Sequence, residues 1–147
     1  MMAHSRAQGF GFEVIRRILA GTYMLSENHH EAFFLQAQRV RAMVLEQFKH
    51  AFSHCDIIFA PVHANLPQSI EQQVEDPTEN WQGDRYTVAV NLVGLPAMSI
   101  PCGFSTGEKP LPIGMQLIGN YFQEGQLLAL ADCYQTHTDW HKRALEQ

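Results

Sequence analysis

The sequence is poor in charge of either sign and poor in cysteine. Charged residues make up 17% of the 147 residues, and ten Lys and Arg against fifteen Asp and Glu give a formal net charge of −5. Clusters of basic residues like those that bind a phosphate backbone are lacking, so direct nucleic-acid binding is not expected. Cys55, Cys102 and Cys133 are too few and too widely spaced for a disulfide framework or a CxxC metal clamp. They favour a reducing compartment, the cytoplasm or an organelle matrix.

A membrane-spanning segment is also lacking, although one stretch is long enough to test. No charged residue lies between Arg85 and Glu108, and a run of that length can cross a bilayer. Gly94, Pro96 and Pro101 divide it into pieces that are too short to span. No secretory signal is visible near the N-terminus. We therefore expect no membrane partner.

Helical periodicity is present in the first third of the chain. Hydrophobic residues make up 46% of the sequence, enough to bury a core. Apolar side chains recur at helical spacing over residues 12–25, which predicts a helix. Asn28 and Glu31 form a possible capping box that opens a longer amphipathic helix ending near Phe52.

Short apolar runs further along the chain predict strands and two more helices. The predicted strands are residues 56–61, which read as buried on both faces, 97–100 and 113–118. Asp84 is the expected N-cap of a helix with an apolar face of Val88, Leu92 and Val93 and a stop at Gly94. A last helix is expected over residues 124–134. Residues 63–83 between these elements predict an irregular functional loop.

Alternating helices and short buried strands indicate an α/β layer architecture. We interpret residues 1–147 as a single segment. Three strands make only a small sheet, and strands that are apolar on both faces need covering layers. The sheet is therefore expected to continue in another polypeptide segment.

Recognisable catalytic and metal-binding motifs are missing. No GxSxG elbow and no glycine-rich phosphate loop is present. His50 and His54, like His137 and His141, have i, i+4 spacing, but neither pair has the third ligand or the internal Glu of a zinc motif. We expect no metal site and no covalent catalysis from this segment alone.

A series of short motifs nevertheless follows the order found in one enzyme family. The motifs are Gly9-Phe10-Gly11, Glu13-Val14-x-Arg16-Arg17-Ile18, Gly21-Thr22-Tyr23-x-Leu25-Ser26, Ala37-Gln38-x-Val40-Arg41, Asp56-Ile57-Ile58, Asn91-Leu92-x-Gly94-Leu95-Pro96, Ile100-Pro101-Cys102-Gly103 and Gly114-x-Gln116-Leu117-Ile118-Gly119. Together they resemble the C-terminal part of amidase-signature enzymes, and above all the A subunits of tRNA-dependent amidotransferases.

The resemblance implies the C-terminal third of an amidase-signature domain, an α/β/α fold whose mixed sheet is covered by helices, and one that is incomplete as a fragment. The family's catalytic Ser, second Ser and Lys lie in its N-terminal and central portions, so this segment is predicted to hold no catalytic residue. Ser26 and Ser99 lie outside the family's signature loop and are not predicted nucleophiles.

Two positions of this segment match substrate-binding residues of the family. Arg17 is expected to bind the α-carboxylate of glutamine, and Asp84 its α-ammonium group. A guanidinium and a carboxylate in these roles select a free amino acid over a bare amide. Asp84 as a simple helix cap and Arg17 as a solvated surface charge remain alternatives.

The function implied is glutamine hydrolysis, which supplies ammonia for converting Glu-tRNA(Gln) to Gln-tRNA(Gln) or Asp-tRNA(Asn) to Asn-tRNA(Asn). The implied partners are glutamine and amidotransferase subunits B and C, with tRNA only indirectly. No cofactor is expected in this segment, since ATP and Mg²⁺ are used by the partner subunit. The isolated chain is expected to self-associate through uncovered apolar surfaces.

Two alternatives stay open. His63 stands where the amidotransferase has a small residue, and a bulky side chain near the pocket mouth fits a stand-alone amidase of the same family. A chain without a nucleophile also fits a non-catalytic, partner-binding module.

Overall fold

The computed structural model describes residues 9–68 and 83–143. These residues form two compact units, Met1–Met43 and Val44–Gln147, and the long helix α3 (Gln36–Phe52) runs from the first unit into the second. Helices and strands alternate along the chain, which confirms the predicted α/β class. The described residues contain no helix long and apolar enough to cross a membrane.

The first unit consists of helices. Helix α2 (Phe12–Met24) confirms the first predicted helix, and a π-helix, η1 (His30–Leu35), leads directly into α3. The predicted capping box at Asn28 is wrong, because the N-cap of η1 is His29 and makes no side-chain cap bond. The carbonyl of Ser26 instead accepts the backbone N–H groups of His29 and His30 at 2.9 Å each, so the turn satisfies its own donors.

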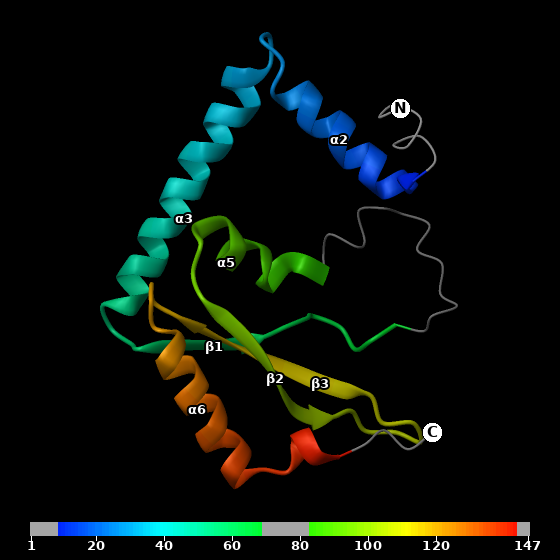
Figure 1. The fold of residues 1–147 in the computed structure, drawn as a ribbon, viewed down its shortest axis with the longest axis vertical. Helices are drawn as coiled ribbons and strands as arrows, with labels where there is room; N and C mark the ends of the chain where they lie inside the picture. Colours follow the sequence, from blue (N-terminus) through cyan, green and yellow to red (C-terminus); the bar gives the residue numbers. More distant parts are fainter. Residues whose placement is uncertain (1–8, 69–82, 144–147) are drawn as a thin grey trace. The chain divides into compact units, whose positions relative to one another are not determined.

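The second unit contains a three-stranded sheet in the order β1-β3-β2, antiparallel throughout (Figure 1). Its strands are β1 (Ile57–Pro61), β2 (Ala97–Phe104) and β3 (Pro112–Gly119), which confirms all three predicted strands. Strand β2 extends beyond its predicted end because an irregularity between Pro101 and Gly103 lets pairing resume. The resemblance implied a mixed sheet, of which these strands form an antiparallel part.

Helices lie on both faces of the sheet, as an α/β/α arrangement requires (Figure 1). One face packs on α6 (Glu124–His137), three residues longer than predicted. The core there consists of Ile100, Met115, Leu117, Leu127 and Ala131. The other face packs on α5 (Val88–Val93) and the last turns of α3. The core there consists of Val90, Val93, Leu95 and Ile118, with Val44, Leu45, Phe48, Phe52 and Ile58 against it.

Two burial predictions are wrong, the second of them in part. Strand β1 is not buried on both faces, because Phe59 is 65% exposed beside an open part of the α6 face. The apolar face predicted for the helix after Asp84 is right at Val93, which is buried, but wrong at Val88 and Leu92, which are exposed. Val90 is buried in their place. A separate 3-10 turn, η2 (Asp84–Tyr86), precedes α5, so the α-helix begins later than predicted.

The end of α5 follows the prediction. Gly94 adopts φ +73°, a left-handed conformation that glycine accepts without strain. The hydroxyl of Tyr121 donates a 2.6 Å hydrogen bond to the carbonyl of Val93, which ties the helix end to the segment after β3. Of the predicted loop 63–83, residues 63–68 contain neither helix nor strand, and residues 69–82 lie outside the described residues.

Candidate functional site

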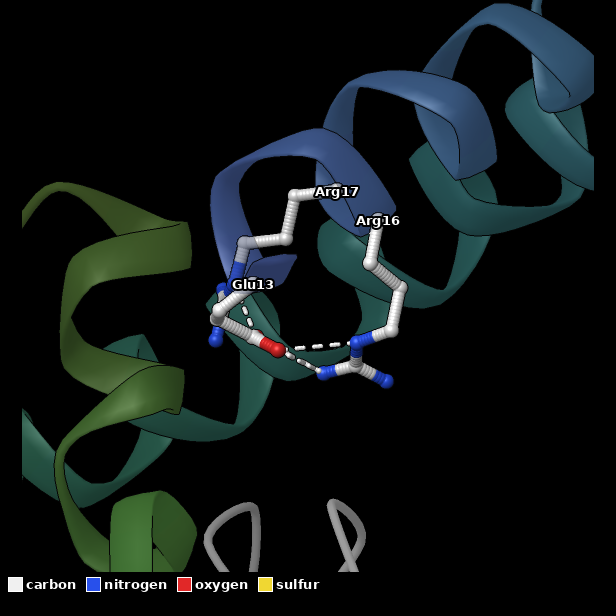
Figure 2. Close-up of polar contacts among 3 residues, drawn as sticks. All are labelled: Glu13, Arg16 and Arg17. Carbon is white, nitrogen blue, oxygen red and sulfur yellow. Dashed lines mark hydrogen bonds and ion pairs between the residues drawn. The ribbon is translucent and has the colours of Figure 1, made fainter. Parts of the chain in front are cut away.

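Arg17 belongs to a cluster of three charged side chains in the first two turns of α2 (Figure 2). Its Nε donates a 2.8 Å hydrogen bond to Oε1 of Glu13. Arg16 binds the same carboxylate through two atoms, with Nε at 2.8 Å from Oε2 and Nη2 at 2.7 Å from Oε1. The spacing i, i+3 and i, i+4 places all three side chains on one side of the helix.

The two guanidinium groups hold the pKa of Glu13 well below its ordinary value of 4.5, at about 2. The hydrogen bond from Arg16 is the largest cause, followed by that from Arg17. Glu13 is therefore ionised at neutral pH. Two cations and one anion leave the cluster with a net charge of 2 − 1 = +1, which suits an anionic ligand.

Asp84 begins the 3-10 turn η2 and is exposed. The prediction that it caps the helix is wrong: the N-cap of η2 is Gly83 and that of α5 is Thr87, and neither makes a side-chain cap bond. Thr87 instead bonds the backbone carbonyl of Asp84, through its N–H at 3.0 Å and its hydroxyl at 3.3 Å. The capping alternative for Asp84 therefore loses its basis, and within residues 9–68 and 83–143 its carboxylate has no hydrogen-bond or ion-pair partner.

Gln116 fixes the turn that carries Asp84. It is the one buried polar residue found among the described residues, at 4% exposure. Its Nε2 donates to the carbonyl of Tyr86 in η2 at 2.8 Å and to that of Pro61 at the end of β1 at 3.0 Å. Strand β3 thereby holds η2 over the sheet.

Two cavities adjoin this part of the second unit. The larger, of about 290 Å³, is lined by Val62, Thr87, Val90, Asn91, Leu95, Ala97, Met98, Ser99 and Gln116. The smaller, of about 190 Å³, shares Val62 and Ser99 with it and is also lined by His63. The Nδ1 atom of His63 accepts a 3.1 Å hydrogen bond from the backbone N–H of Asn65, and its ring lies against Gly83. His63 therefore lines the smaller cavity, and its place at the mouth of a substrate pocket stays a prediction.

Several of the serines and histidines considered from the sequence have structural partners. The hydroxyl of Ser26 donates to the carbonyl of Tyr23 at 2.7 Å, and Ser99 is an exposed residue of β2. The rings of His50 and His54 pack with centroids 4.9 Å apart. Within residues 9–68 and 83–143, no three His, Cys, Asp or Glu side chains gather where they could hold a metal ion.

The structure gives Arg17 and Asp84 different surroundings, in the first and the second unit respectively. It brings Arg17 together with Glu13, which sequence reasoning had not considered as a site residue. An acidic residue three and four positions before two arginines on a helix was the available signal. The role of Gln116 was also missed, although an amide in a strand of otherwise apolar residues marks a group that needs internal partners.

Comparison with known proteins decides the family. The family model described as Amidase matches residues 1–128. The chain belongs to the amidase family. The predicted resemblance is thereby confirmed.

The curated relatives of this amidase chain include A subunits of Glutamyl-tRNA(Gln) amidotransferase from two bacteria. It is 53% identical over 145 residues to the A subunit of Glutamyl-tRNA(Gln) amidotransferase from Bordetella pertussis, covering 98% of this chain and 28% of the relative. Identity to the same protein of Dechloromonas aromatica is 51% over 143 residues, 97% of this chain and 29% of the relative. The amidase chain thus spans under a third of these relatives' length, in their C-terminal part.

Solved structures agree on the fold. The A subunit of Glutamyl-tRNA(Gln) amidotransferase from Thermotoga maritima matches with a TM-score of 0.62 and 37% identity, over 85% of this chain and 27% of that one. A crystal structure of an amidase matches with a TM-score of 0.71 and 22% identity, over 91% and 30%. The amidase-signature fold, present here in part, is confirmed.

Proposed function

We propose that this chain is the substrate-binding part of the glutamine-hydrolysing A subunit of a tRNA-dependent amidotransferase. The observation that carries the proposal is 53% identity over nearly the whole chain to the A subunit of a Glutamyl-tRNA(Gln) amidotransferase. With partner subunits B and C, the ammonia released from glutamine would convert Glu-tRNA(Gln) to Gln-tRNA(Gln) or Asp-tRNA(Asn) to Asn-tRNA(Asn). The partner subunit would use ATP and Mg²⁺, and tRNA would interact with this chain only indirectly.

Arg17 and Asp84 are the residues proposed to bind glutamine. Arg17 carries a permanent positive charge in a cluster with net charge +1, which favours the α-carboxylate. Asp84 is exposed on a turn anchored by Gln116, which favours binding of the α-ammonium group.

The catalytic serines and lysine are proposed to come from the preceding part of the relatives' length. Ser99 and His63 line one cavity of about 190 Å³, but among the described residues no hydrogen bond joins them, and no lysine lines either cavity next to Ser99. The chain on its own should therefore release no ammonia from glutamine.

A hybrid enzyme tests the proposal. It joins this chain to the preceding part of the Bordetella pertussis relative, in place of the C-terminal part to which this chain is 53% identical. We expect the hybrid to hydrolyse glutamine and, with subunits B and C, to amidate Glu-tRNA(Gln). A hybrid that hydrolyses simple amides but neither uses glutamine nor supports amidation would favour the stand-alone amidase instead.

A further inference from the structure

We propose that Glu13 is a positioning residue that orients the Arg17 guanidinium for the α-carboxylate of glutamine. The inference rests on the proposed function, since it needs Arg17 to bind substrate. Glu13 itself is not proposed to contact glutamine; it would contribute to the preference for this substrate through Arg17.

The first step is the choice of atoms in the ion pair. Glu13 binds Arg17 through Nε alone, at 2.8 Å. Within the described residues Arg17 makes no other side-chain hydrogen bond, so both Nη groups stay available. A carboxylate binds a guanidinium best through two parallel N–H donors, and the Nη pair supplies that fork.

The second step concerns the freedom of the Arg17 side chain. It is 65% exposed, so packing does little to restrict its several rotatable bonds. An arginine that is held in one conformation before the ligand arrives loses less conformational entropy on binding. The bond to Glu13 is the restraint that the described residues provide.

The third step is the stability of the restraint itself. Arg16 holds the Glu13 carboxylate from the other side with two hydrogen bonds of 2.8 and 2.7 Å (Figure 2). Glu13 also lies in the first turn of α2, where the positive end of the helix dipole favours a carboxylate. Arg16 thus fixes Glu13, and Glu13 fixes Arg17.

Kinetics of the hybrid enzyme test this chain of contacts. Glu13→Gln should raise the KM for glutamine three- to tenfold and change kcat by less than twofold, because positioning affects binding in the ground state and the transition state alike. In an Arg17→Ala background the same substitution should change KM by less than twofold. Glu46→Gln is the matched control: it removes a 2.8 Å ion pair to Lys49 on α3 and should leave KM unchanged.

The outcomes separate the two proposals. If Arg17→Ala raises KM and Glu13→Gln does not, the positioning role is wrong and the proposed function stands. If Glu13→Gln raises KM equally with Arg17 present or absent, Glu13 acts through the fold and not through Arg17, which also overturns the role. A KM that Arg17→Ala leaves unchanged contradicts both.

A second measurement needs no catalysis and uses the same hybrid enzyme. In NMR spectra, the Arg17 Nε–H should exchange with water at least threefold more slowly in the wild type than in Glu13→Gln. Equal exchange rates would show that the pair does not restrain Arg17 in solution, and would overturn the inference whatever the kinetics show.

Discussion

The side-chain amide of Gln116 donates a 2.8 Å hydrogen bond to the backbone carbonyl of Tyr86, thirty positions away in the sequence. The bond joins the middle strand of the sheet to the turn that carries Asp84. A buried amide that also bonds Pro61 at 3.0 Å leaves η2 little freedom. The position of Asp84 therefore depends on a residue of another element.

Gln116→Leu should destabilise the second unit, because leucine fills the space but leaves the Tyr86 and Pro61 carbonyls without their donor. The expected loss in free energy of unfolding is about 1–3 kcal/mol. Urea unfolding measures it as a lower midpoint at unchanged slope. Gln126→Leu on the exposed side of α6 is the control and should stay within about 0.5 kcal/mol of the wild type. Equal midpoints for both variants would contradict the anchoring role of Gln116.

Gly119→Ala should destabilise the packing of α6 on the sheet. A Cβ at this position would lie 3.2 Å from Cγ of the buried Leu127, so the helix or the leucine must move. We expect a loss of about 1–2 kcal/mol, partly recovered in the double variant with Leu127→Val. Gly125→Ala in α6, where a Cβ meets nothing within 4 Å, should instead stabilise by up to about 1 kcal/mol. The midpoint of thermal unfolding, measured for the three variants, tests this prediction. A Gly119→Ala variant as stable as the wild type would mean that the contact with Leu127 is loose.

The isolated chain should self-associate through the exposed apolar side chains of α2. Phe12 is 76% exposed and Leu19 is 64% exposed, and surfaces of this kind favour association. Replacing both by serine should weaken association at least tenfold in sedimentation equilibrium, whereas Ala20→Ser should have no effect. A wild-type chain that stays monomeric across the concentration range would contradict this prediction.

The helicity of α2 should depend on acid pH through Glu13. Its pKa is lower in the folded chain, about 2, than the ordinary value of 4.5, so its contribution is fully present above about 4.5 and is lost as the pH falls toward 2. Circular dichroism should show a loss of helix in that window which Glu13→Gln abolishes and Glu27→Gln does not. High salt should reduce the effect, since the side chains of Glu13 and Arg17 are exposed. A titration that is identical in wild type and Glu13→Gln would contradict the strength of the cluster.

Much of the fold could be predicted from the sequence, because periodicity and punctuation act locally. Helix α2, the strands and the stop at Gly94 follow from apolar spacing and from glycine chemistry. The burial of β1 could not be predicted, because the exposure of Phe59 depends on what lies over that face of the sheet. The late start of α5 was missed because nothing local in the sequence distinguishes a helix that starts at Asp84 from a 3-10 turn followed by a helix.

The candidate site shows the same division. The family motifs indicated Arg17 and Asp84, and their roles stay predictions. The supports of these residues needed coordinates: the bond from Gln116 to Tyr86 spans two elements that no sequence spacing links. Helical spacing does link Glu13 to Arg17, but only the structure shows which guanidinium nitrogen the bond occupies.

The central claim is that Arg17 and Asp84 bind the two charged groups of one glutamine, and substrate preference in the hybrid enzyme tests it most directly. The measurement is kcat/KM for glutamine relative to 4-aminobutanamide, which lacks the carboxylate, and relative to glutaramate, which lacks the ammonium group. Arg17→Ala should reduce the first preference about 10- to 150-fold, the equivalent of a hydrogen bond to a charged group, and leave the second nearly unchanged. Asp84→Asn should reduce the second preference and leave the first nearly unchanged. Preferences equal to those of the wild type in both variants would contradict the account.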